Sequence, residues 1–82
     1  MFYVYVIKSH KTGEFYKGFT DNLERRLHQH SLGNSTFSKN KLPIELIHAE
    51  LCNSRKEARK LEKYLKSGFG REIIKELSEK KD

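Results

Sequence analysis

Residues 21–33 predict a helix whose two ends are both marked in the sequence. Asp21 is suited to cap the N-terminus, with Glu24 three residues later, and Gly33 is suited to end the helix with a positive φ. At roughly 100° per residue, four side chains share one arc of this helix: Leu23, Arg26, Leu27 and His30. That arc should face the core, although half of it is a guanidinium and an imidazole.

Two interpretations of these polar side chains stay open at this point. Arg26 could lay its aliphatic stem on apolar surface and keep its charged head in water, as arginine commonly does. His30 could be a hydrogen-bonded core histidine or could interact with the negative end of the helix dipole. Alternatively, both side chains belong to a functional site.

Length and charge limit the class of protein. With 82 residues we expect one domain, residues 1–82, with a small core. The net charge of +6 and the pI of about 9.6 favour a polyanionic partner, nucleic acid before a membrane surface.

The sequence also indicates a compartment. Cys52 is the only cysteine, which excludes an internal disulfide and makes a reducing cytosol the expected location. Met1 leads directly into strand-like residues, so we expect no signal peptide. No apolar run approaches the roughly 18 residues that a membrane span requires. We therefore expect a cytoplasmic protein without a membrane partner.

Hydrophobic patterning and turn residues predict the order of elements. Residues 2–7 are aromatic and β-branched throughout, which is typical of a strand covered on both faces. Ser54 and Glu57 form a capping box at the start of a second helix. The predicted order is β-β-α-β-α-α, at residues 2–7, 15–19, 21–33, 44–51, 54–66 and 71–79. Helices beside a small antiparallel sheet make the fold class α+β.

The first two predicted strands bring two tyrosines together. In residues 15–19, Tyr16 and Gly18 share one face, and Lys17 lies on the other with two phenylalanines. A hairpin through residues 9–14 places Tyr5 within a residue or two of Tyr16 across the strands. The turn is too irregular for the sequence to decide the register.

The second helix carries a carboxylate at the edge of its apolar stripe. Ala58, Leu61 and Leu65 define the stripe, and Glu62 lies about 40° from Ala58 on the helical wheel. A carboxylate in that position is costly unless it is paired or coordinates a cation. Two interpretations remain open here, a salt bridge to Arg26 or a lysine, and a metal ligand.

If both helices pack near the tyrosine face, these polar groups converge on one shallow site. The chemistry they could support is metal-assisted phosphodiester cleavage, although a purely structural polar cluster is the alternative. Glu62 would recruit Mg²⁺ or Mn²⁺, and Arg26 would stabilise charge on the phosphoryl group. A tyrosine would deprotonate the attacking water, and His30 would accept or relay that proton.

At these residues the chain resembles the GIY-YIG nuclease superfamily over nearly its whole length, as a small stand-alone member similar to the incision domain of nucleotide-excision repair. Tyr3-Val4-Tyr5 and Tyr16-Lys17-Gly18 stand where the two triplets are expected, ten residues apart. The resemblance continues through the Arg26 helix with His30 and ends in a run that contains Glu62. It implies a three-stranded antiparallel sheet flanked by helices and a one-metal hydrolytic centre. The essential arginine falls on Arg26, and the metal-binding glutamate falls on Glu62. Tyr5, Tyr16 and His30 complete the expected catalytic set.

The expected substrate is DNA, bound through its backbone. Lys39, Lys41 and Lys66 would contact phosphates without reading bases. Lys17 departs from the apolar residue usual in the second triplet, and either snorkels to solvent or adds a phosphate contact. We expect selectivity for branched, flapped or damaged DNA rather than for a sequence, or a partner protein that supplies recognition. Two alternatives stay open, a non-catalytic nucleic-acid-binding module and a protein-interaction module.

Overall fold

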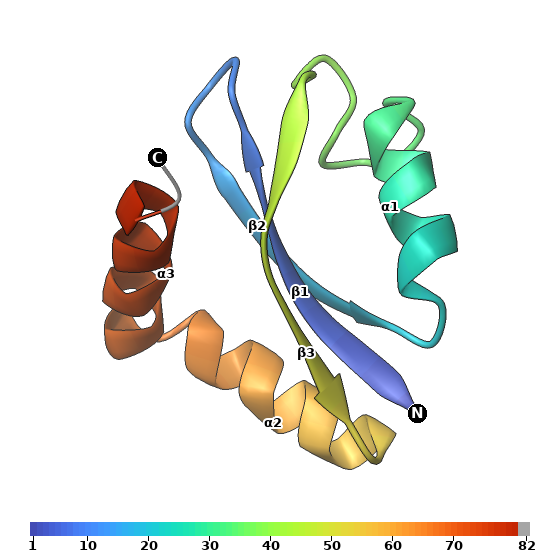
Figure 1. Ribbon diagram of the computed structural model, residues 1–82, viewed down its shortest axis with the longest axis vertical. Helices are drawn as coiled ribbons and strands as arrows, with labels where there is room; N and C mark the ends of the chain where they lie inside the picture. Colours follow the sequence, from blue (N-terminus) through green and yellow to red (C-terminus); the bar gives the residue numbers. More distant parts are fainter. Residues whose placement is uncertain (81–82) are drawn as a thin grey trace.

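The computed structural model describes residues 1–80, so the last two residues of the predicted domain lie outside it. It has the predicted α+β fold in the predicted order. The elements are β1 (Phe2–Ser9), β2 (Phe15–Thr20), α1 (Leu23–Ser31), β3 (Ile44–Cys52), α2 (Arg55–Leu65) and α3 (Gly68–Lys80). The three strands form one antiparallel sheet in the order β2-β1-β3, which leaves β2 as an edge strand (Figure 1).

The central strand β1 is buried on both faces, as its uninterrupted apolar sequence predicts. Val4, Tyr5, Val6 and Ile7 are all at most 1% exposed. Tyr5 pairs with Gly18, and Ile7 pairs with Tyr16. Because side chains alternate along a strand, Tyr5 and Tyr16 lie on the same face, two residues out of direct opposition, as predicted.

The helices cover different faces of this sheet (Figure 1). The main core lies on the Val4 and Val6 face and includes residues of β3, α2 and α3: Ile47, Cys52, Ala58, Leu65 and Ile74. On the opposite face, His30 of α1 contacts Tyr5. The expectation that both helices pack against the tyrosine face is therefore wrong for α2. The Tyr5 face is already covered by α1 and the loop that follows it, so the apolar stripe of α2 packs against the other face.

The first helix starts one residue later than predicted. Its N-cap is Asn22, whose side chain accepts a hydrogen bond from the Arg25 amide at 3.0 Å, and not Asp21. Thr20 Oγ1 accepts from the Asn22 amide and so positions this residue as the cap. Asp21 instead lies 3.6 Å from Arg25 in an exposed ion pair. The predicted positive φ at Gly33 is confirmed at +76°.

The third helix begins at Gly68, three residues earlier than predicted, because Gly70 allows close packing on α2. A Cβ atom on Gly70 would overlap the backbone of Tyr64 and Leu65. Ser67 Oγ accepts from the Gly70 amide at 3.3 Å and supports the first turn of the helix. The glycine-containing segment 67–70, which suggested a break, is therefore the contact that sets α3 against α2.

We expect Gly70→Ala to destabilise the domain by about 1–3 kcal/mol, because the added methyl group would overlap rigid backbone. Gly68→Ala is the matched control, since nothing lies within 4 Å of the position of its Cβ. Urea unfolding followed by circular dichroism measures both variants. Equal stabilities for the two variants would show that the close approach at Gly70 is not needed.

Candidate active site

The Tyr5 hydroxyl is the centre of a buried polar network between the sheet and α1. It lies 3.0 Å from His30 Nε2 and accepts a hydrogen bond from Arg26 Nε at 3.4 Å. Burial raises the pKa of Tyr5, and the hydrogen bond from Arg26 opposes part of that shift. Tyr5 is therefore a neutral phenol at neutral pH, held between a cation and an imidazole.

The His30 imidazole is fully buried and is bonded at both ring nitrogens. Nδ1 lies 2.6 Å from Ser35 Oγ, which in turn lies 2.6 Å from Ser38 Oγ. Burial first, and the positive charge of Arg26 second, lower the pKa of His30 to about 4. The ring is therefore neutral at pH 7. A proton on Nδ1 that is donated to Ser35 leaves Nε2 to accept from Tyr5.

Arg26 lies at the partly exposed border of this network. Its Nη1 donates to Gln29 Oε1 at 3.0 Å, while its Nε donates to Tyr5. Within residues 1–80, no carboxylate forms an ion pair with Arg26. A guanidinium that lies beside a tyrosine and forms no ion pair within residues 1–80 is suited to bind a phosphate.

Tyr16 is stacked among the rings of this network. Its ring centroid lies 6.1 Å from that of Tyr5, 5.4 Å from that of His30 and 5.1 Å from that of Phe37. Gly18 allows both phenols to pack against the backbone of β2, since a Cβ atom there would lie 2.9 Å from the Tyr5 hydroxyl and 2.8 Å from the Tyr16 ring. A larger residue would displace the tyrosines.

Four predicted site residues, Tyr5, Tyr16, Arg26 and His30, thus form one cluster on the α1 side of the sheet. Sequence reasoning missed the loop residues that complete it, Ser35, Phe37 and Ser38. The available signal was a Ser-x-x-Ser spacing shortly after a core-facing histidine. Ser35 and Ser38 each accept a hydrogen bond from the other's backbone amide, which holds the loop against His30.

A known protein family matches most of this chain. The model of the GIY-YIG catalytic domain matches residues 1–76. The chain belongs to the GIY-YIG family.

Its relatives include small stand-alone GIY-YIG proteins. A UPF0213 protein of Staphylococcus haemolyticus is 30% identical over 79 residues, with 95% of each chain covered. A UPF0213 protein of Bacillus licheniformis is 37% identical over 65 residues, which cover 78% of this chain and 66% of the relative. The solution structure of a UPF0213 protein from Bacillus halodurans matches with a TM-score of 0.56 and 28% identity, covering 94% of this chain and 85% of that one. GIY-YIG is a family of nucleases, which generally use a divalent metal ion and act on DNA.

Glu62, which the resemblance predicts to be the metal-binding glutamate, lies outside the hydrogen-bonded cluster. It projects from α2, which packs against the face opposite Tyr5. Its side chain is 20% exposed, and its carboxylate lies 3.4 Å from Lys66 Nζ one turn later. Of the two pairings considered from sequence, the lysine pair is therefore the one in the structure.

The position of Glu62 relative to β2 gives it access to the edge of the sheet. At the start of α2 the Arg55 guanidinium lies 5.8 Å from the centroid of the Phe19 ring. The pKa of Lys17 on β2 is lowered by burial first, by the charge of Arg71 second, and by the charge of Lys66 third. Lys66 directly follows the C-terminal end of α2, so this end of the helix also lies near β2. Glu62 therefore lies on a helix that runs beside β2. Because β2 is an edge strand, a ligand at this edge is open to groups from both faces.

A one-carboxylate metal site fits the donor set of this GIY-YIG domain. No group of three or more His, Cys, Asp or Glu side chains in residues 1–80 is arranged to hold a metal ion. Mg²⁺ keeps several water ligands and needs only one or two protein carboxylates. Glu62 is partly exposed and is paired with a flexible lysine, so a divalent cation could displace Lys66.

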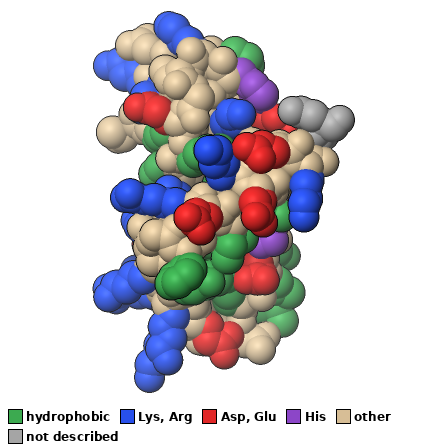
Figure 2. All heavy atoms as spheres, turned by 90° about the vertical axis from the view of Figure 1, so that its left-hand side faces the viewer, with side chains coloured by type: hydrophobic (Ala, Val, Ile, Leu, Met, Phe, Trp, Pro, Cys, Tyr) green, Lys and Arg blue, Asp and Glu red, His purple; other side chains and the backbone are tan. Residues whose placement is uncertain are grey.

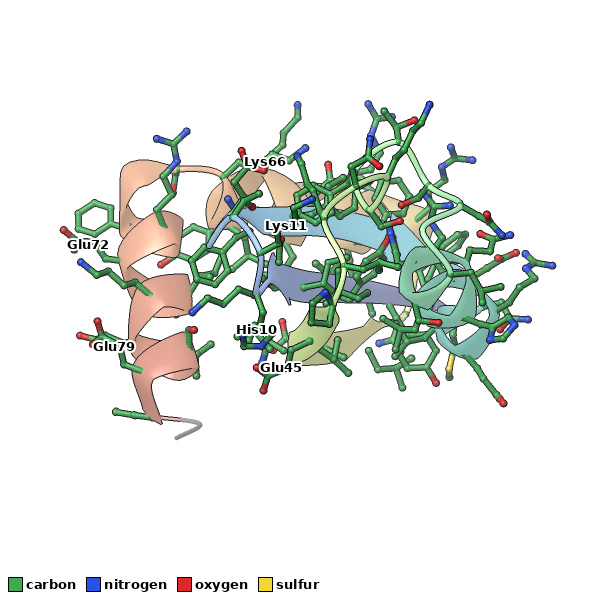
Figure 3. All side chains as sticks on the ribbon, turned by 90° about the horizontal axis from the view of Figure 1, so that it is seen from above. His10, Lys11, Glu45, Lys66, Glu72 and Glu79 are labelled. Atoms are coloured by element: carbon green, nitrogen blue, oxygen red, sulfur yellow. The ribbon has the colours of Figure 1, made fainter. Side chains whose placement is uncertain are left out.

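The predicted DNA-binding lysines lie in different surroundings. Lys41 Nζ forms an ion pair with Glu14 at 2.6 Å and lies 4.5 Å from the Phe37 ring centroid, so it fastens the loop. Lys39 is exposed on the same loop. Lys66 lies on the β2 side of the domain (Figure 3), close enough to Lys17 for their charges to interact.

No helix within residues 1–80 is long and apolar enough to cross a membrane.

Proposed function

We propose that this GIY-YIG domain hydrolyses phosphodiester bonds in DNA, with Mg²⁺ or Mn²⁺ held by Glu62. The observation that carries the proposal is the Arg26–Tyr5–His30 network. It joins a guanidinium that has no ion-pair partner among the described residues to a phenol and a neutral imidazole, and the phenol packs against Gly18 on the edge strand β2.

Arg26 would bind the scissile phosphate. Its fork-shaped guanidinium matches two phosphate oxygens, and Tyr5 and Gln29 already orient it through two of its N–H groups. Charge that develops on the phosphoryl oxygens would then meet a fixed donor in a partly buried setting, where such an interaction is strong. A bound divalent cation would supply further positive charge to the phosphate and its leaving oxygen.

Tyr5 would move the proton of the attacking water. Its raised pKa means that it carries its own proton, so it acts as a relay. The water proton goes to Tyr5 Oη while the Tyr5 proton passes to His30 Nε2, 3.0 Å away. Tyr16 has no such hydrogen bond to His30 among the described residues, and its ring contacts suit it to hold Tyr5 in place beside Gly18.

Substrate binding would make His30 a better proton acceptor. The charge of Arg26 is the second cause of the low pKa of His30. A phosphate bound to Arg26 offsets that charge and raises the pKa of the imidazole. The proton relay is therefore favoured only when substrate is present.

Target choice would follow DNA structure rather than base sequence. The groups assigned here contact phosphate and water, and phosphate contacts carry no sequence information directly. A branched, flapped or damaged DNA presents a phosphate at the sheet edge more readily than a regular duplex does. A partner protein that delivers such a target is compatible with this site.

Cleavage assays on branched and linear DNA with Mg²⁺, Mn²⁺ or EDTA test the proposal. We expect cleavage with either metal, none in EDTA, and a loss of about 10²-fold or more in Glu62→Gln, because the amide is a poor metal ligand. Glu72→Gln, on the outer face of α3 (Figure 3), is the matched control and should retain activity. All variants are purified in parallel, so a contaminating nuclease would appear in every sample.

Two other outcomes would replace the proposal. A salt-sensitive gel shift without metal-dependent cleavage would identify a nucleic-acid-binding module. The absence of a shift at low salt would identify a protein-interaction module with a structural polar cluster.

A further inference from the structure

A second cationic surface lies on the sheet face opposite Arg26. A groove runs between the β1–β2 hairpin and α3, and its lining includes four cations, Lys8, Lys17, Arg71 and Lys75. Arg71 and Lys75 are four residues apart and project from the same side of α3. Sequence reasoning had singled out only Lys17 of these four.

The cations of this groove are not paired with acidic side chains in residues 1–80. None of the four cations forms an ion pair with another described residue. Lys8 Nζ instead donates to Ser78 Oγ at 3.3 Å and lies 5.7 Å from the Phe15 ring centroid. Glu79 is the one acidic residue in the lining, and its side chain points away from the sheet (Figure 3).

Of the acidic residues of α3, Glu79 lines the groove and Glu72 does not, and both side chains point away from the sheet (Figure 3). Figure 2 shows this face of the molecule, with several basic side chains along its left margin and others among the acidic side chains near the middle. Lys17 is partly buried, and the nearby Arg71 and Lys66 add like charge. Collecting cations in this way costs free energy in the isolated protein, and a polyanion would recover it.

We propose that this groove binds the phosphate backbone of a second DNA segment, on the opposite side of the β2 edge from the segment held by Arg26. The inference rests on the proposed function only in taking DNA as the polyanion. Lys17 belongs both to the groove and to the second triplet. A lysine in place of the usual apolar residue would therefore serve as a phosphate contact in this groove. A DNA that reaches both faces of β2 must bend around the edge, which a junction or a flap does more readily than a straight duplex.

The test measures DNA binding in EDTA, so that it does not depend on cleavage. We expect Arg71→Gln/Lys75→Gln to reduce the slope of log K against log salt concentration by about 1.8, or about 0.9 for each lost phosphate contact. The reduction should be the same for two branched DNAs of unrelated sequence. Circular dichroism verifies that the variant is folded, which is expected because both side chains are exposed.

Arg59→Gln/Lys63→Gln is the charge-matched control. It removes two cations from the rival basic surface on α2, which Arg59 and Lys63 line with three other cations. An unchanged slope in the control and a reduced slope in the α3 variant support the groove. Equal reductions, or a reduction only in the control, overturn the proposal. Loss of cleavage with normal salt dependence would instead count against the proposed function and not against the groove.

Discussion

Replacing Arg26 with lysine is expected to lower the rate of DNA cleavage about 10²- to 10³-fold while DNA affinity changes little. The substitution keeps the positive charge and so most of the long-range attraction to DNA. It removes the planar fork whose Nε donates to Tyr5 at 3.4 Å and whose Nη1 donates to Gln29 at 3.0 Å. Single-turnover cleavage and equilibrium binding, measured on the same substrate, separate the two effects.

Arg25→Lys is the natural control for this prediction. Arg25 is the adjacent residue, its side chain is 65% exposed, and it pairs with Asp21 outside the cluster. We expect wild-type cleavage from this variant. A rate within about threefold of wild type for Arg26→Lys would mean that the guanidinium geometry does not stabilise the transition state, since one oriented donor is normally worth far more.

Folding stability should fall by about 3 kcal/mol as the pH is lowered from about 6.5 to about 4, because of His30 alone. The pKa of His30 is lowered from 6.5 to about 4 in the folded protein. The unfolded chain therefore binds a proton in this window that the folded chain does not. The stabilisation is fully present above pH 6.5 and is lost as the pH approaches the folded pKa. Urea unfolding at a series of pH values measures the effect.

His30→Gln removes this titration, and the difference between the variant and the wild type isolates it from other acid-sensitive contacts. One such contact is the Glu14–Lys41 ion pair, whose lysine lowers the pKa of Glu14. His28→Gln, at a position on the same helix but outside the network, should retain the full pH dependence. A wild type whose stability is flat between pH 6.5 and 4 would contradict a buried neutral imidazole.

The elements of this fold follow from local signals. Alternation, β-branching and the turn at residues 9–14 predict the two strands that carry Tyr5 and Tyr16, and the helical period predicts that Arg26 and His30 share a core-facing arc. These signals act between residues near one another in the chain. For that reason the α+β class, the order of elements and the tyrosine pair could be predicted from the sequence, together with the GIY-YIG resemblance.

The tertiary structure decided how these elements combine. It placed α1 and α2 on opposite faces of the sheet, moved Glu62 away from the Tyr5 network, brought Ser35 to His30, and set Arg71 and Lys75 beside Lys17. Which face of the sheet a helix covers depends on how segments far apart in the sequence pack against the same apolar surface. Local sequence patterns do not predict that choice. The sequence by itself therefore determined which residues are candidates for nuclease chemistry, and only long-range packing determined which of them meet.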